Sequence, residues 1–299
     1  MAVEVAAGVQ SSPGLEQEVA PRRTPWRQLM RDPLAGTGLT LVGLLVLAAV
    51  FAPLLTSLDP AAVDATRRLE TPSAEHLLGT DELGRDLFSR VLFGARWSLG
   101  IAGLATFVVM VIGVIIGVIS GYYGGVLDTL VMRVVDVLLA FPNLVLYLAI
   151  VGTLGPGVKN VFFALIAISW AGYARIVRGL VLSARERDFV RASLALGASD
   201  RRLMVRHILP NVVSPVVVLA SLQAGGMILA LAALGFFGLG AQPPTPEWGT
   251  MINQSRLYLQ SAPMLMLAPG LAISLAVLGF NLFGDGLRDV LDPRVGRSR

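Results

Sequence analysis

Charged and apolar residues fall in long separate blocks along this chain. Asp, Glu, Lys and Arg are absent from 33–58, 97–127, 137–158, 160–174, 208–246 and 257–284. A helix that crosses the roughly 30 Å hydrocarbon core of a membrane needs about 20 apolar residues. Five stretches are long enough. We expect 160–174 to continue through Arg175 and Arg178 to Leu182, because arginine side chains reach the interface from a helix end. The pattern predicts an all-α integral membrane protein.

Composition points to the same class. Hydrophobic residues make up 55% of the 299 residues and charged residues 15%, against about 45–50% and 25% in soluble domains, even when Gly is counted as apolar. There is no Cys, which excludes disulfides, thiolate metal sites and a Cys nucleophile. The net charge is +4. In a membrane protein this excess follows the cytoplasmic loops, so we expect membrane lipid and no nucleic acid as a partner.

The distribution of arginine orients the spans. Arg gathers in three segments: the first 31 residues (Arg22, Arg23, Arg27, Arg31), 184–207 (Arg185, Arg187, Arg191, Arg201, Arg202, Arg206) and 285–299 (Arg288, Arg294, Arg297, Arg299). If all three are cytoplasmic, an even number of spans separates each pair. The 39 residues of 208–246 then form one span, which Gly225-Gly226 would bend and Pro243-Pro244 would end. We expect six transmembrane helices with cytoplasmic N- and C-termini.

This topology divides the chain into successive regions. They are a disordered cytoplasmic tail (1–31) without the apolar run of a secretory signal, a first transmembrane helix (32–58), an external segment (59–96), a five-helix domain (97–285) that contains a cytoplasmic loop (184–210), and a cytoplasmic tail (286–299). The external segment holds five Arg against the orientation rule, together with seven acidic residues. Within it, 84–97 alternates at helical spacing and predicts an interfacial helix. Its apolar side would be Leu87, Phe88, Val91, Leu92 and Phe93, and its polar side Arg85, Asp86, Ser89 and Arg90.

A few residues inside the spans have local interpretations. Gly113 and Gly117 form a G-x-x-x-G pair, which lets two helices approach closely. Arg133 and Asp136 are three residues apart, so we expect a pair on one helix face. Asp128 would precede that helix, where an acid suits the N-terminal dipole.

Catalytic and metal-binding motifs are missing from the sequence. The chain has no G-x-x-x-x-G-K-[ST] loop, no H-E-x-x-H and no G-x-S-x-G, and its one Lys, Lys159, lies in GPGVKN. His76 and His207 are far apart in sequence, and we expect both at a surface or interface. We predict no catalytic residue, no metal site and no cofactor bound by this chain.

The stretch 184–215 carries the most specific pattern. A short amphipathic helix is predicted over 188–196, with Phe189, Val190, Leu194 and Ala195 available for contact. Gly197 suits the turn after a helix. Ser199 or Asp200 can cap a second helix, and Leu209-Pro210 would begin the next span. Such a segment is either an ordinary cytoplasmic connector or a helix held for another protein to grip.

This stretch resembles the EAA loop in the permease subunits of ATP-binding-cassette (ABC) importers. That pattern reads E-A-A, three residues, G, nine residues, I-x-L-P. Arg191-Ala192-Ser193 stand at E-A-A, Gly197 at the glycine, His207 at the Ile and Leu209-Pro210 at L-P, so the first acid and the Ile are replaced. The resemblance implies an ATPase-coupling loop made by Asp188, Phe189, Arg191, Ala192, Ser193, Leu194, Gly197, Ala198, Leu209 and Pro210.

Further motifs resemble one branch of these permeases, the C-type member of the dipeptide, oligopeptide and nickel permease pairs. They are LLGTDELGRDLFSRVLFGARWSL (77–99), GYYGG (121–125), MRVVDVLLAFPNL (132–144) and LGFFGLGAQPPTPEWGTM (234–251). The resemblance implies the type I ABC importer permease fold in a bacterial plasma membrane. It also implies a second permease as partner, two ATPases that bind ATP and magnesium, and an external substrate-binding protein.

Three alternatives stay open. Within the same family, the substrate could be a nickel chelate or glutathione in place of di- or oligopeptides. A stand-alone secondary transporter or channel would need ionisable groups near mid-bilayer, and the spans show almost none. A membrane-embedded enzyme would need a catalytic constellation. The sequence does not assign substrate-binding residues.

Overall fold

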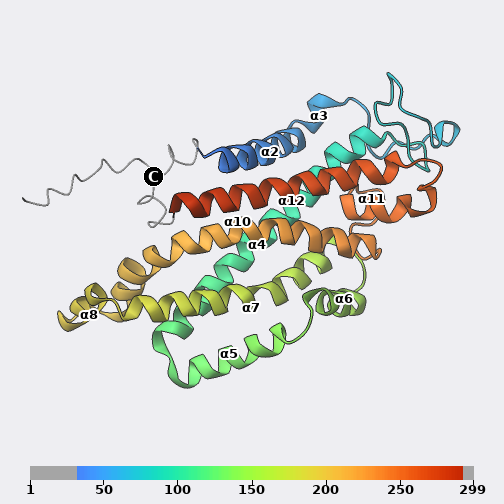
Figure 1. The fold of residues 1–299 in the computed structure, drawn as a ribbon. Helices are drawn as coiled ribbons and strands as arrows, with labels where there is room; N and C mark the ends of the chain where they lie inside the picture. The colour runs from blue at the N-terminus through green and yellow to red at the C-terminus, as the bar shows by residue number, and fades with distance from the viewer. Residues whose placement is uncertain (1–31, 292–299) are drawn as a thin grey trace, which may run out of the picture.

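Long helices run from one end of the molecule to the other in the computed structural model, which describes residues 32–291 (Figure 1). They are α2 (Pro33–Val50), α4 (Leu87–Tyr123), α7 (Val158–Arg185), α10 (Leu209–Phe236) and α12 (Met264–Leu291). Shorter helices join or flank them: α3 (Ala52–Leu55), η1 (Ala65–Arg67), α5 (Gly125–Leu139), α6 (Asn143–Leu154), α8 (Asp188–Ala195), α9 (Asp200–Arg202), η2 (Leu203–Ile208), α11 (Trp248–Ser255) and η3 (Arg256–Tyr258). The described residues contain no β-strand, only one isolated bridge.

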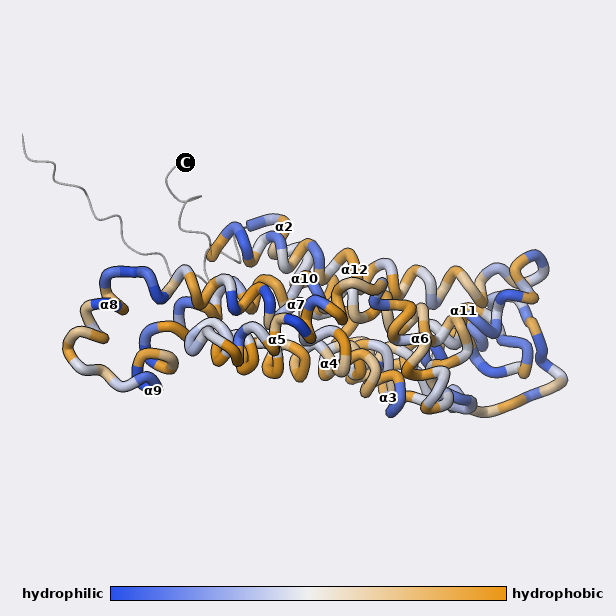
Figure 2. The backbone as a smooth tube through the Cα atoms, turned by 90° about the horizontal axis from the view of Figure 1, so that it is seen from below, coloured by the Kyte–Doolittle hydropathy of each residue, from blue (hydrophilic) through white to orange (hydrophobic). Residues whose placement is uncertain are grey.

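Within this part of the chain, five helices are long and apolar enough to cross a membrane, and the pair α5–α6 brings the number to six if it forms one span. Figure 2 shows hydrophobic residues along the middle of the molecule and hydrophilic residues gathered at both ends. The all-α membrane class is therefore confirmed.

The single straight span predicted over 137–158 is wrong. The chain turns by 89° between α5 and α6. Pro142 stands at the break, directly before α6. Proline lacks an N–H and disfavours helical backbone at the residue before it, so α5 cannot continue through this position.

Three other helix ends differ from the predicted boundaries. The first span ends at Val50, where Phe51 leaves helical geometry before α3 and its Pro53. The last helix begins at Met264 instead of 257 and continues to Leu291, past the predicted end at 285. The predicted tails, 1–31 and the part of 286–299 beyond Leu291, lie outside the described residues.

The helix α10 ends at Phe236, seven residues before the proline pair that was expected to stop it. Gly238 follows with φ +79°. Its N–H donates to the Gly235 carbonyl at 2.9 Å, and the Leu239 N–H donates to Leu234 at 2.9 Å. This is a Schellman turn, which satisfies the last carbonyls of a helix.

The predicted interfacial helix over 84–97 is also corrected. It forms the first turns of α4, which runs on without a break to Tyr123. Its polar side faces inward: Arg85 and Arg90 are each 2% exposed. Both guanidinium groups meet Asp81, with Nε–Oδ2 distances of 2.6 Å for Arg85 and 3.2 Å for Arg90. A buried charge needs such a partner. Asp81 of segment 59–96 neutralises this polar side, and Leu87 of the predicted apolar side is buried as well.

His76 is buried, contrary to its expected surface position. Its Nδ1 lies 2.9 Å from an Asp86 carboxylate oxygen, and its Nε2 lies 3.0 Å from the Arg67 guanidinium. Arg67 also donates to Glu75, and this hydrogen bond lowers the pKa of the Glu75 carboxyl. The external segment is therefore an ordered cap on the start of α4.

A second element at the same end of the molecule, α11, is held to α4 by Glu247. This carboxylate is 1% exposed and caps α11, where it accepts from the Gly249 and Thr250 N–H groups at 2.7 and 2.8 Å. The Ser98 hydroxyl of α4 lies 3.4 Å away. Burial raises the pKa of Glu247, and these hydrogen bonds offset part of the increase. Neighbouring Trp248 donates its indole N–H to the Val91 carbonyl at 3.0 Å.

Glycines bring α4 and α7 into close contact. A Cβ added at Gly117 would lie 2.7 Å from the Val177 Cβ, and one at Gly121 would lie 3.0 Å from the Arg178 carbonyl. Gly113 meets Tyr173 in the same way. The packing predicted for the G-x-x-x-G pair is present and extends by one more turn.

Ion pairs join α5 to α7, where a pair within α5 was expected. Asp136 pairs with Arg175 and not with Arg133. Asp128, in the first turn of α5, receives Arg178 at 2.5 Å. Because the chain bends after Leu139, α5 lies beside α7. The acidic residues of α5 therefore pair with arginines of α7.

Candidate functional site

The loop that joins α7 to α10 protrudes at one end of the molecule, at the left of Figure 1. The helix α2 begins and the helix α12 ends toward this same end, while α3 and α11 lie toward the opposite end. The described chain thus begins and ends at the end that carries α8, as an even number of crossings requires. That this end faces the cytoplasm stays a prediction.

The short helix predicted over 188–196 is present as α8, and its C-terminal turn is built around Gly197. This residue has φ +79°. Its N–H donates to the Leu194 carbonyl at 2.9 Å, and the Ala198 N–H donates to Ser193 at 3.1 Å. The pair forms a second Schellman turn. Ser199 occupies the N-cap position of α9, but its side chain makes no capping hydrogen bond.

Most of the predicted coupling residues are exposed. Phe189 is 42% exposed and Leu194 is 57% exposed. Also exposed are Asp188, Arg191, Ala192, Gly197 and Pro210, whereas Ser193, Ala198 and Leu209 are half-buried. Ala195 and Leu196 are exposed as well. The structure brings the segment 188–198 together as one protruding surface, and places Leu209-Pro210 apart from it at the start of α10.

The inner side of the loop rests on the bundle. Val190 of α8, Leu203 and Ile208 are buried. The Phe189 ring lies 6.4 Å from the ring of His207, which follows on η2. The turn over 203–208 is π-helical, a rare form that often marks functional positions. An apolar face therefore seats the short helix while its other face stays open.

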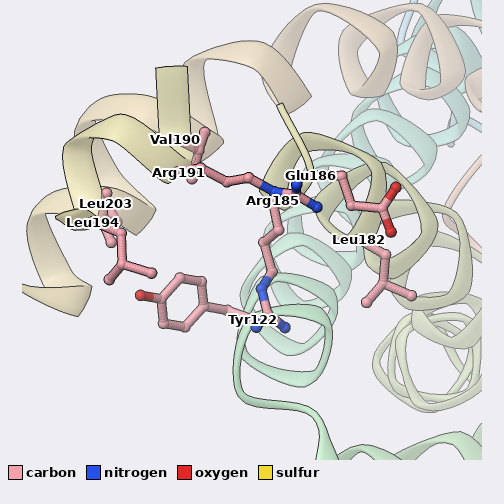
Figure 3. Close-up of a pocket in the computed structure, with 8 residues that line it drawn as sticks. All are labelled: Tyr122, Leu182, Arg185, Glu186, Val190, Arg191, Leu194 and Leu203. Carbon is pink, nitrogen blue, oxygen red and sulfur yellow. The ribbon is translucent and has the colours of Figure 1, made fainter. Parts of the chain in front are cut away.

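A pocket of about 430 Å³ lies between α8 and the ends of α4 and α7 (Figure 3). Arg185 extends over the Tyr122 ring, with 5.4 Å from its guanidinium carbon to the ring centroid, and Leu194 and Leu203 line the wall near the Tyr122 hydroxyl. Arg191 reaches from α8 toward Arg185 and Glu186.

Polar contacts in this region tie both the loop and the end of α7 to α4. The Tyr122 hydroxyl donates to Asp200 at 2.7 Å, and Arg185 donates to the Gly121 carbonyl at 3.1 Å. Sequence reasoning did not assign these three side chains to the site. The signal was the GYYGG segment, which was noted only as a motif. Movement of the loop can thus be transmitted to α4 as well as to the two helices that it joins.

Metal binding finds no support in this region. Among residues 32–291, no group of three or more His, Cys, Asp or Glu side chains is arranged to hold a metal ion.

Comparison with known families decides the class of protein. Residues 113–297 match the binding-protein-dependent transport system inner membrane component, and residues 21–72 match the N-terminal TM domain of oligopeptide transport permease C. The chain belongs to this family of transport-system inner membrane components. The predicted type I ABC permease fold and the position as a multi-pass protein of a bacterial plasma membrane are confirmed.

Two relatives are similar over nearly their whole lengths. The dipeptide transport system permease protein DppC of Alkalihalophilus pseudofirmus is 47% identical over 277 residues, which cover 93% of this chain and 91% of the relative. The glutathione transport system permease protein GsiD of Escherichia coli O157:H7 is 45% identical over 278 residues, 91% of this chain and 92% of the relative. Such coverage makes the chain a permease component of an ABC transporter.

Proposed function

We propose that this chain is the permease subunit of an ATP-driven importer of di- or oligopeptides. It would form the translocation path with a second, related permease. Two ATPase subunits would bind on the side of α8 and an external substrate-binding protein on the opposite side. ATP and magnesium would bind to the ATPases, since this chain lacks a phosphate-binding loop.

The protruding α8 is the observation that supports coupling. It has a seated apolar side, an exposed side with Phe189 and Leu194, and a sharp turn at Gly197. A partner that grips this helix differently in two states would shift the balance between them. Because Tyr122 binds Asp200 of the loop and Arg185 holds the end of α7 to α4, the spans would follow the movement of the loop. The permease would then alternate between inward- and outward-facing forms.

Glutathione import is the second candidate, because the relative of that name is nearly as similar as the dipeptide permease. A nickel chelate is a third possibility within the same family. A stand-alone ion-coupled transporter is disfavoured by the pairing of the acids near the spans, since Asp128 and Asp136 both pair with arginines of α7.

The test is reconstitution of the complete complex in liposomes with its binding protein. ATP hydrolysis and uptake of a labelled Ala-Ala dipeptide and of glutathione would be measured together, and mass spectrometry would identify what the purified binding protein carries. Dipeptide uptake that requires ATP and all subunits supports the proposal. Uptake of glutathione alone favours the second candidate. Uptake that needs neither ATPase nor ATP would contradict an ABC importer.

A further inference from the structure

A hollow of about 700 Å³ opens between α6, α7 and α10, away from the coupling loop. In Figure 1, α7 and α10 lie side by side and α6 lies near the end of α7. The volume of the hollow lies within the range of about 300–1,000 Å³ that is usual for small-molecule sites.

Polar but uncharged groups gather in this hollow. Asn143 begins α6, Gln223 lies on α10, and the Tyr147 hydroxyl lies 2.8 Å from the Ser169 hydroxyl. No Asp, Glu, Lys, Arg or His is among the described residues that line it. In helices that are otherwise apolar, amide and hydroxyl groups are costly to expose to lipid, so their convergence indicates a hydrated or ligand-binding wall.

Two glycines of the wall make no close contact with another helix of this chain. A Cβ added at Gly172 or at Gly226 would meet no atom within 4 Å. By contrast, Gly225, the next residue, packs against α12 and would bring a Cβ 3.4 Å from the Val277 carbonyl. A glycine weakens a helix interior, and here no close helix contact explains it. The missing side chains at Gly172 and Gly226 leave space in the hollow.

We propose that this hollow is the part of the substrate path that this subunit contributes, and that it binds the amide backbone of a passing peptide through Asn143 and Gln223. Side-chain amides both donate and accept, so they match the N–H and C=O groups of any peptide. The absence of charge would let peptides pass regardless of side-chain charge. This inference rests on the proposed function.

Glycine substitutions test the path directly, because a Cβ added at Gly172 or Gly226 meets no atom of another helix. In the reconstituted complex, Gly226→Leu and Gly172→Leu should lower uptake of a labelled Ala-Ala dipeptide about tenfold or more, because leucine occupies the open space. Gly226→Ala should give a smaller loss. Stimulation of ATP hydrolysis by the binding protein should persist. Gly103→Leu is the matched control, since Gly103 of α4 is an exposed helical glycine with equal open space outside the hollow.

Gln223 provides a second, independent readout. Gln223→Glu should shift the uptake ratio toward a Lys-containing dipeptide and away from a Glu-containing one, an effect that a purely structural role would not produce.

The outcomes separate the alternatives. Unchanged uptake in both leucine variants, with wild-type transport intact, overturns this inference and leaves the proposed function standing. Failure of the leucine variants to co-purify with the second permease would show that Gly172 and Gly226 serve subunit packing, and would overturn the role in peptide passage given to them here. If the wild-type complex imports neither peptide nor glutathione, the proposed function fails and this inference with it.

Discussion

Gly197 is the residue on which the coupling hypothesis depends most directly. Its φ of +79° lies in the left-handed region, which β-branched residues rarely adopt. A Cβ there would meet no atom within 4 Å, so a substitution strains only the backbone.

We therefore expect Gly197→Val to cost about 1–2 kcal/mol at this turn while leaving the spans folded. The altered turn should weaken ATPase binding or separate hydrolysis from uptake. Both would be measured together in the reconstituted complex. Gly197→Asn is the control, because asparagine tolerates this conformation better. Wild-type assembly, hydrolysis and uptake in Gly197→Val would show that the loop is only a connector.

Glu247 offers a second prediction at the residue scale. Each of its carboxylate oxygens accepts a backbone N–H, from Gly249 and from Thr250. In Glu247→Gln, the side-chain NH₂ would face one of these donors whichever way the amide is turned. We expect the free energy of unfolding of Glu247→Gln to be about 1–3 kcal/mol lower than that of the wild type.

The loss would be measured as a lower thermal unfolding temperature of the purified protein in detergent. Gln260→Glu, at an exposed position in the connection between α11 and α12, is the control. An unfolding temperature equal to that of the wild type would show that the capping bonds contribute little.

At the scale of elements, the contact between α4 and α7 depends on glycine. Gly117→Leu would drive a side chain into Val177 and the Ala174 carbonyl, both 2.7 Å from an added Cβ. Overpacking of this kind costs about 1–3 kcal/mol or more. We expect little folded protein in membranes, as judged by size-exclusion chromatography in detergent. Gly100→Leu, which meets open space on the same helix, should behave as wild type. Equal yields of the two variants would argue against this packing.

The ion pair between α5 and α7 is testable by reversal. Arg178→Asp places a second carboxylate beside that of Asp128. The variant should destabilise the protein, because like charges repel. The double variant Arg178→Asp with Asp128→Arg should recover part of the lost stability. A double variant no better than the single one would show that the pair does not hold α5 in place.

At the scale of the whole molecule, the position of the two polar ends across the membrane decides the topology. A chain without cysteine permits single-cysteine labelling without background. We expect an impermeant thiol reagent to label Ala74→Cys in intact cells, because that exposed residue lies in the external cap, and to leave Ser199→Cys unlabelled until the cells are opened. If Ser199→Cys is labelled in intact cells and Ala74→Cys is not, the orientation in the membrane is the reverse of the predicted one.

The amino-acid sequence alone determined the membrane class, the approximate spans and the short helix before Gly197, because each depends on local pattern: uninterrupted apolar runs, arginine placement and a glycine at a helix end. Resemblance added the family. Tertiary structure decided what depends on residues distant along the chain. The polar side of the first turns of α4 faces inward because Asp81 neutralises Arg85 and Arg90. His76 lies in the interior because Asp86 and Arg67 supply polar partners for its ring nitrogens. The 89° bend placed the acids of α5 against α7. The hollow beside Gly226 arose because helices α6, α7 and α10 converge there, which no local pattern encodes.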